Sequence, residues 1–474
     1  MLACPNPQCS FALKHGHPAE YRETFTTCSD CGTALVKAVA ATAPPKPPAV
    51  GAPLGPVLVT VAVAAVIVAL SFIRIVNQEG GEGFIAAFNQ PTWMAPTTMG
   101  LAPFLSAFIV VELIALIPAL NRRRVGTFAQ RRPLKLAAWI TGAVFLIIQS
   151  VSLLMWLRAA RSMIPILGLP AAAAIGLIAL TTLLMFGATE LIERRGVGNG
   201  FAVVLAAGSA GELYTVAANL YRGLITETLT LVGLLIVLGL LTAIGFATVK
   251  LTALPRGNAG KPGWVPVPAS TVQPVSVAPA LLSLPATLGL GFAFELQRSA
   301  LLYNGITAGV AAALALLLGY LFFRPAQVGA MWKVWQPDGD AAPKQEWASR
   351  QLPRALALGA LSCVALAIGP ALISSLLNTP VSGALSVTVL SAIVADVVEE
   401  ARARHQLGPL TAIRPLSRLT ELEPALSALT AANIPAFPRA GHYRVLLGFF
   451  APYAPVTLLV PASRAEEARA ILDR

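Results

Sequence analysis

Long apolar runs alternate with short polar loops over most of the chain, from Pro56 to Glu400. Each run holds about 17–24 residues, which suffices to cross roughly 30 Å of hydrocarbon at about 1.5 Å per helical residue. The pattern predicts an all-α polytopic membrane domain with about ten transmembrane helices. The expected spans are residues 56–76, 98–120, 136–157, 170–190, 200–220, 228–249, 273–294, 303–323, 355–378 and 383–400.

Less apolar segments flank this membrane domain, which we place at residues 56–404. Residues 1–36 form a small cysteine-containing module, and residues 37–55, rich in alanine and proline, favour an extended linker. Residues 405–474 predict a small α+β domain. Within it we expect helices over 419–432 and 465–472, strands over 443–450 and 456–460, and a separating segment over 409–415.

Charge is scarce and unevenly placed. Charged residues make up 12% of the 474 residues, against about 25% in soluble domains. The net charge of +12 arises mainly in alternate loops, such as 122–124, whereas the other loops hold only Arg158, Arg161, Arg222 and Arg298. We expect a protein of the bacterial inner membrane, and this asymmetry predicts that both of its termini lie in the cytoplasm. It also explains the basic composition without nucleic-acid binding.

The expected spans lack the groups that intramembrane enzymes need. The four histidines, His15, His17, His405 and His442, lie outside them, so a Ser–His protease has no base. Asp396 is the only aspartate near the lipid, which leaves no aspartyl dyad. We therefore expect no enzyme. Glu112 in the second span leaves three alternatives open: a proton-coupled transporter, a water-lined position and a polar contact between helices.

Four cysteines at the N-terminus have the spacing of a metal site. Cys4 and Cys9 form one close pair, and Cys28 and Cys31 form a second pair 18 residues later. Two such pairs predict a zinc ribbon, in which four thiolates close a structural tetrahedral site. Metal binding would supply the folding free energy that so short a module lacks. Reduced cysteines in a disordered leader, or an iron–sulfur cluster, are the alternatives, and Cys363 in an apolar run is a packing residue.

The most informative stretch is the turn from Ala188 to Gly200, followed by an apolar run from Phe201. By residue chemistry alone it is a tight turn between two spans, with three glycines and an asparagine to reverse the chain. Its residues resemble the turn between the fourth and fifth spans of SecY, whose pattern is Gly-Glu-x-Ile-Thr-Glu-Arg-Gly-Ile-Gly-Asn-Gly. The matching residues are Glu190, Ile192, Arg195, Gly196, Gly198, Asn199 and Gly200. Thr189, Glu193 and Arg194 depart from it.

Two further stretches resemble the SecY/Sec61α family. Gly100–Ile114 is similar to the second span, and Val272–Leu281 to the beginning of the seventh, so the resemblance covers about residues 56–400. It implies a protein-conducting channel of two pseudo-symmetric five-helix halves around a pore sealed by a ring of aliphatic side chains. The matched ring residues are Leu105, Ile109, Leu205 and Leu281. Simple packing between helices is the alternative for all four.

The resemblance also implies partners. The substrate would be a translocating polypeptide, with a SecE-like and a SecG-like subunit beside the channel. Gln336 stands where the family has an arginine in the loop between spans eight and nine, which argues against docking of SecA or a ribosome. The outer loop from Asn77 to Thr98 corresponds to the place of the family's plug. A short plug helix over 82–88 and a plain connector are both open for this loop. The alternative function is a non-conducting SecY-fold scaffold or sensor that works through its terminal domains.

The C-terminal residues 405–474 resemble small ferredoxin-like modules of the DUF2007 type. The similar stretches are Glu421–Leu426, Ala432–Phe437 and Val456–Ala462, the last followed by Glu466–Ile471. This resemblance implies a regulatory or docking role, and a domain that only adds stability is the alternative.

Overall fold

The structure is a computed structural model of the whole chain. It describes residues 2–4, 20–21, 26–34, 36–37, 54–73, 76–78, 93–97, 99–115, 117, 119–120, 128–160, 163–165, 170–208, 210–253, 275, 278, 300–322, 324–326, 328–329, 342–377, 383–416, 419–446 and 455–472. Two compact units are present: Met1–Gly51 with His405–Gly408, and Ala52–Arg404 with Pro409–Arg474.

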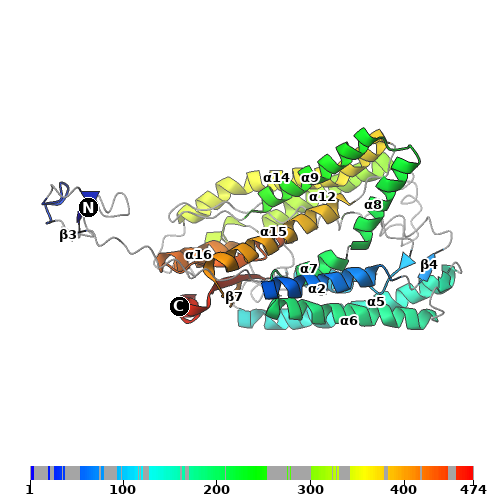
Figure 1. Ribbon diagram of the computed structural model, residues 1–474, viewed down its shortest axis with the longest axis horizontal. Helices are drawn as coiled ribbons and strands as arrows, with labels where there is room; N and C mark the ends of the chain where they lie inside the picture. Colours follow the sequence, from blue (N-terminus) through cyan, green and yellow to red (C-terminus); the bar gives the residue numbers. More distant parts are fainter. Residues whose placement is uncertain are drawn as a thin grey trace. The chain divides into compact units, whose positions relative to one another are not determined.

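Long helices dominate the second unit (Figure 1). They are α2 (Leu54–Ser71), α3 (Ala102–Ile114), α5 (Phe128–Ala160), α6 (Ala171–Arg195), α7 (Gly200–Gly208), α8 (Ala210–Ile225), α9 (Leu231–Thr252), α12 (Ala300–Phe322), α14 (Ala342–Leu377) and α15 (Ala384–Leu407). A three-stranded antiparallel sheet of order β5-β4-β6 joins Trp93–Met94, Val76–Gln78 and Met163–Pro165.

Seven helical segments among the described residues are long and apolar enough to cross a membrane. They coincide with seven of the ten expected spans and are Leu54–Ser71, Arg132–Met155, Ala171–Arg195, Gly200–Ile225, Leu231–Thr252, Leu302–Leu321 and Gln345–Leu376. The second expected span appears as the shorter apolar helix Ala102–Ile114, and the tenth as α15. Most of the seventh expected span, 273–294, lies outside the described residues.

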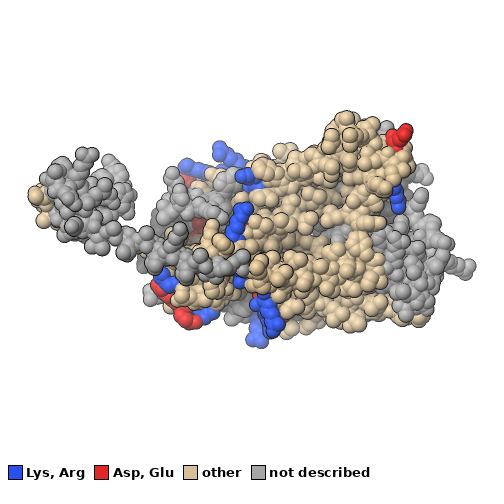
Figure 2. All heavy atoms as spheres, in the orientation of Figure 1, with Lys and Arg blue, Asp and Glu red and all other residues tan. Residues whose placement is uncertain are grey.

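The outer faces of these helices are apolar, as lipid contact requires. Large hydrophobic side chains such as Leu58 on α2, Ile147 on α5 and Leu184 on α6 are about two-thirds exposed, at 64%, 64% and 63%. Figure 2 shows this surface as a broad tan region, with most of the coloured Lys and Arg side chains gathered along one side of it. The described helices thus form a polytopic membrane bundle.

The bundle has two halves, α2–α8 and α9–α15. In the first half, α2 packs on α6, α7 and α8, α5 packs on α3 and α6, and α6 packs on α7. In the second, α12 packs closely on α14. Helix α15 touches both halves, because Ile393 and Ala392 join the core of the first half and Ser391 lies against Gly245 of α9.

The C-terminal residues form a sheet of order β7-β9-β8 covered by helices. Its elements are β7 (Leu410–Leu416), a 3-10 turn (Leu419–Glu421), α16 (Leu422–Ala431), β8 (Phe437–Arg439), α17 (Gly441–Leu446), β9 (Val456–Pro461), a second 3-10 turn (Ala462–Arg464) and α18 (Ala465–Leu472). Both pairings with the central strand β9 are antiparallel. Leu352 of α14 shares the buried core of this domain.

The C-terminal predictions are partly confirmed. The helices over 419–432 and 465–472 and the strand over 456–460 are confirmed. The strand expected over 443–450 is wrong where described, because Gly441–Leu446 forms α17. The segment expected over 409–415 as a separator is wrong, because Leu410–Leu416 forms the strand β7. Its register shifts between Ala412 and Arg414. Pro415 is tolerated because β7 lies at the edge of the sheet.

The N-terminal unit is built on a small antiparallel sheet. Strand β1 (Leu2–Ala3) lies between β2 (Glu20–Tyr21) and β3 (Val36–Lys37). A bridge between Thr27 and Ala34 closes a second short hairpin around Cys28 and Cys31. Strands this short have little apolar core, so their stability must come from another source.

Candidate functional site

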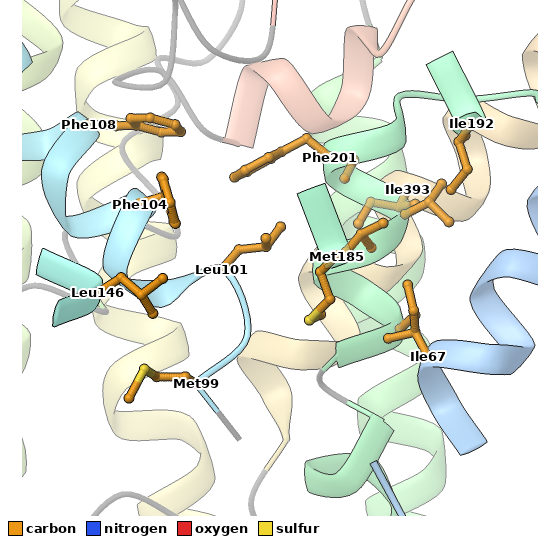
Figure 3. Close-up of a cluster of buried hydrophobic side chains, with 14 of the residues drawn as sticks. Ile67, Met99, Leu101, Phe104, Phe108, Leu146, Met185, Ile192, Phe201 and Ile393 are labelled. Atoms are coloured by element: carbon orange, nitrogen blue, oxygen red, sulfur yellow. The ribbon is translucent and has the colours of Figure 1, made fainter. Parts of the chain in front are cut away.

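An aromatic and aliphatic cluster lies where α3, α5, α6 and α7 meet (Figure 3). The Phe104 and Phe186 ring centroids are 4.1 Å apart, and Trp139 lies 4.9 Å from Phe186. Phe108 packs 6.0 Å from Phe201 of α7. Edge-to-face contacts of this kind add to the free energy of burial. The cluster therefore fixes α3 against the other helices of its half.

Three of the four predicted ring residues adjoin this cluster. Leu105 and Ile109 are one helical turn apart on α3, and Leu205 is on α7; all three are half-buried and pack against it. Leu281 lies outside the described residues. Glu112, farther along α3, is buried, with 1% of its surface exposed. The structure places these three aliphatic side chains against one buried cluster, and their role as a pore ring stays a prediction.

The predicted turn motif joins α6 to α7 and is tightly packed. Gly200 has no room for a side chain, because a Cβ there would lie 2.0 Å from the Thr189 carbonyl oxygen. Gly198 has φ +85°, and a Cβ would lie 2.7 Å from Val397 of α15. Asn199 accepts a hydrogen bond from the Ala202 amide at 3.0 Å, which caps the start of α7. The glycines are thus required by a close approach of backbones.

Neighbouring helices hold the turn in place. The Thr60 hydroxyl of α2 accepts from the Val197 amide at 2.8 Å and lies 2.9 Å from the Val197 carbonyl oxygen. Glu193 accepts from the Gly200 amide at 2.9 Å. Among the matched residues Ile192, Gly196, Gly198, Asn199 and Gly200 are buried, whereas Glu190 and Arg195 are exposed. The motif therefore consists of a buried turn with two charged side chains at its surface.

A buried ionic network beside the turn was not predicted from the sequence. Glu400 of α15 is fully buried and accepts from Nη2 of Arg439 at 2.7 Å and from its Nε at 2.9 Å. The same carboxylate accepts from the Gly198 amide at 2.9 Å and from Nε of Arg404 at 2.9 Å. Nη1 of Arg439 lies 3.4 Å from Glu193. Strand β8, α15 and the turn therefore share one set of charges.

A second polar contact lies one helical turn earlier on α15. The two carboxylate oxygens of Asp396 accept from the amides of His442 and Tyr443 at 2.9 and 2.8 Å. Nδ1 of His442 lies 2.8 Å from the Thr252 hydroxyl of α9, and its Nε2 lies 3.4 Å from Glu399. These bonds explain why the chain forms α17 here. Ala440, with φ 65°, turns β8 into it.

The environment of His442 favours its charged form. Burial lowers the pKa of His442, but the hydrogen bond with Glu399 and the charges of Asp396 and Glu399 outweigh burial and hold the pKa above its ordinary value.

The sequence offered one signal for this site, the acidic residues at the end of the last span. Their partners lie far along the chain, so no local pattern indicates the contact. Glu400 and Arg439 are 39 residues apart, and Asp396 is 46 and 47 residues from His442 and Tyr443.

Three of the four predicted metal ligands converge in the N-terminal unit. The sulfur atoms of Cys4, Cys28 and Cys31 all lie within 4.8 Å of one another, and Cys4 and Cys31 are 3.4 Å apart. A tetrahedral Zn site requires about 3.8 Å between sulfurs at a Zn–S distance of about 2.3 Å. The Thr33 hydroxyl and the Thr33 amide lower the pKa of Cys31 to about 6. The donor set therefore fits a thiophilic ion, and Cys9 lies outside the described residues.

Taken together, the bundle of apolar helices and the buried turn between α6 and α7 define a polytopic helical membrane protein. The SecY family model matches residues 97–398, more than half of the 474 residues. The chain therefore belongs to the SecY family. The predicted resemblance is confirmed over that range, which includes the turn motif and all four predicted ring positions.

Several solved structures are similar in fold. One is described as the structure of a protein conducting channel, with 14% identity and a TM-score of 0.47; another concerns the plug domain of the SecY protein, with 15% and 0.45. A third is Sec61 in the canine ribosome-channel complex from the endoplasmic reticulum, with 16% and 0.43. Each similarity covers 74% of this chain and 93% of the other. No curated protein matches the chain in sequence.

Proposed function

We propose that the chain is a protein-conducting channel subunit, which lets polypeptides cross or enter the bacterial inner membrane and keeps both of its termini in the cytoplasm. The observation that supports this most is the SecY family match over residues 97–398. Leu105, Ile109 and Leu205 would form the waist around the moving chain. Aliphatic side chains suit that role, because they make no fixed bonds to a passing polypeptide and exclude water and ions when it is absent.

The channel would perform no chemical reaction. A translocating polypeptide is its substrate, and the driving energy comes from a partner. A SecE-like subunit would clamp the two halves, and a SecG-like subunit would complete the assembly. The loop that bears Gln336 lacks the arginine expected for docking of SecA or a ribosome, so we infer that a different cytoplasmic partner delivers the substrate.

The N-terminal unit is proposed to hold one structural zinc ion between Cys4, Cys9, Cys28 and Cys31. The three converging sulfur atoms support this. Four thiolate ligands leave no open position on the metal, so its contribution would be to fold a unit too small to be stable alone.

Crosslinking tests the proposed channel directly. A photoreactive residue replaces Leu105 or Ile109 in the full chain, and a stalled nascent membrane or secretory polypeptide is supplied in membrane vesicles. The channel predicts adducts at both positions and none at Ile147, which is 64% exposed on the lipid side of α5. If no adduct forms at 105 or 109 while a SecE-like subunit remains bound, the scaffold or sensor alternative replaces the channel.

A further inference from the structure

The β8–α17 segment, Phe437–Leu446, joins the C-terminal domain to both halves of the membrane domain. On the first half, Arg439 lies 3.4 Å from the Glu193 carboxylate and 3.3 Å from its carbonyl oxygen. On the second half, Arg439 pairs with Glu400 of α15, and His442 meets Thr252 of α9. The segment therefore fastens two groups of helices that a channel must be able to separate.

The charges in this contact are almost completely removed from water. The Glu400 side chain is 0% exposed and that of Arg439 is 5% exposed. A two-point pair between guanidinium and carboxylate has a fixed geometry, and loss of one partner leaves the other buried and uncompensated. Glu193 is one of the three departures from the SecY turn pattern, so a residue that the pattern does not specify takes part in the contact.

The segment also contributes to the buried cluster against which the predicted ring residues pack. Tyr443 and Leu446 of α17, 0% and 3% exposed, belong to the same buried cluster as Phe104, Phe108 and Phe201. Figure 3 shows these three aromatic side chains side by side. Leu105, Ile109 and Leu205 pack against the same cluster. A docked α17 therefore occupies apolar surface next to the residues that would surround a polypeptide.

We propose that the β8–α17 segment is a built-in closure of the channel: while Arg439 and Asp396 hold it in place, α17 covers the waist and ties the two halves together, and this segment must withdraw before a polypeptide can enter. This inference rests on the proposed channel function. It gives the C-terminal domain a role as a gate and not as a stabilising appendage.

A reversible lock tests the closure. Thr252 Oγ1 and His442 Nδ1 are 2.8 Å apart, so the paired substitutions Thr252→Cys and His442→Cys place two thiols on facing side chains. Loss of the free thiols on oxidation verifies that the disulfide has formed. A photoreactive residue at position 109 reports the passage of a stalled nascent chain. We expect at least a 10-fold loss of adduct in the oxidised protein and full recovery on reduction, whereas each single cysteine variant responds to neither treatment.

The outcomes separate the closure from the channel. Equal adduct yields in the oxidised and reduced protein would overturn the closure and leave the channel standing. No adduct in either state, nor in the parent chain, would overturn the channel and the closure with it.

Hydrogen exchange on the full chain in lipid nanodiscs provides a second measurement that needs no transport. Arg439→Gln should speed exchange of the 441–446 amides by roughly 100-fold, because Glu400 then lies buried without its main partner. Arg404→Gln removes a cation from the same carboxylate but leaves the Arg439–Glu400 pair intact. It should change the exchange rates of the 441–446 amides by less than about 3-fold. Strand β9 should stay protected in both variants.

Loss of protection in β9 of Arg439→Gln would mean that the whole C-terminal domain has unfolded. In that case Thr252→Val is used instead, because Thr252 lies on α9, outside the C-terminal domain. It should still release α17, with a smaller increase of roughly 5-fold. Unchanged exchange of 441–446 in Arg439→Gln, or in Thr252→Val where that variant replaces it, would overturn the proposed closure.

Discussion

Glu400 of α15 and Arg439 of β8 form a two-point ion pair, with bonds of 2.7 and 2.9 Å, in a site nearly closed to solvent. The pair joins the last membrane helix to the C-terminal domain, and the Gly198 amide of the α6–α7 turn donates to the same carboxylate. Three parts of the chain that are distant in sequence thereby depend on one side chain.

Glu400→Gln should destabilise the protein strongly. The amide leaves Arg404 without its counter-charge and Arg439 with only the 3.4 Å contact to Glu193, which costs about 3–5 kcal/mol in a buried site. Thermal unfolding in detergent micelles measures this loss. Glu346→Gln is the matched control, because its ion pair with Arg350 is 63% and 74% exposed and contributes about 0–1 kcal/mol. Equal thermal unfolding midpoints for Glu400→Gln and Glu346→Gln would contradict the claim that the buried network stabilises the protein.

Gly200→Ala should prevent the α6–α7 turn from closing. A Cβ at this position lies 2.0 Å from the Thr189 carbonyl oxygen, so the backbone must move, and we expect a loss of about 2 kcal/mol or more. Gly187→Ala on α6 has nothing within 4 Å of the added carbon and should gain up to about 1 kcal/mol in helix stability. The yield of folded protein and the unfolding midpoint report both effects, and a harmless Gly200→Ala would show that the turn is loose.

The docking of α17 should weaken as pH rises. The pKa of His442 is raised in the folded protein by Glu399 and Asp396 of α15, while Thr252 of α9 contributes no charge. A raised pKa means that the stabilisation is complete below the unfolded value, about 6.5, and is lost as pH rises through the folded value.

Amide exchange of 441–446, corrected for the intrinsic rate at each pH, should therefore show falling protection above that pKa. In His442→Gln the loss of protection over the titration range of the histidine should be smaller than in the parent protein. Protection that rises with pH in the parent protein would contradict the assigned ion pair.

The N-terminal unit should contain about one zinc ion per chain, as four thiolate ligands imply. Cys28→Ser removes one ligand, and the metal content measured by mass spectrometry should fall towards zero, with loss of the folded unit. Cys363→Ser is the control, because Cys363 is buried in α14, which belongs to the other compact unit. Bound iron with visible absorbance would instead favour a cluster, and an unchanged zinc content in Cys28→Ser would refute the site.

Much of the membrane domain could be predicted from its sequence, because lipid imposes long apolar helices that the pattern reveals directly. The turn was recognisable because its glycines meet a backbone constraint that other residues cannot satisfy. The strand β7 was missed because Pro409 and Pro415 suggested a break, whereas β7 lies at the edge of its sheet, where a proline is tolerated.

The contact between α17 and α15 was unpredictable for a different reason. Tyr443 and Val445 alternate with polar neighbours as in a strand, and the helix forms because Asp396 accepts from two of its amides. Arg439 and Glu193 are 246 residues apart, so no local pattern indicates that they meet. Long-range pairs of charges set both the local structure and the position of the domain.

The central claim is that Leu105 and Ile109 face a path for polypeptide and not the lipid, and spin-label accessibility measures this most directly. Nitroxide labels at 105, 109 and, as the lipid-facing reference, 147 are compared in bilayers while a stalled polypeptide occupies the protein. We predict that a water-soluble relaxing agent or the polypeptide itself affects the labels at 105 and 109, and that oxygen dissolved in the lipid dominates at 147. An oxygen-dominated profile at all three positions would contradict the account.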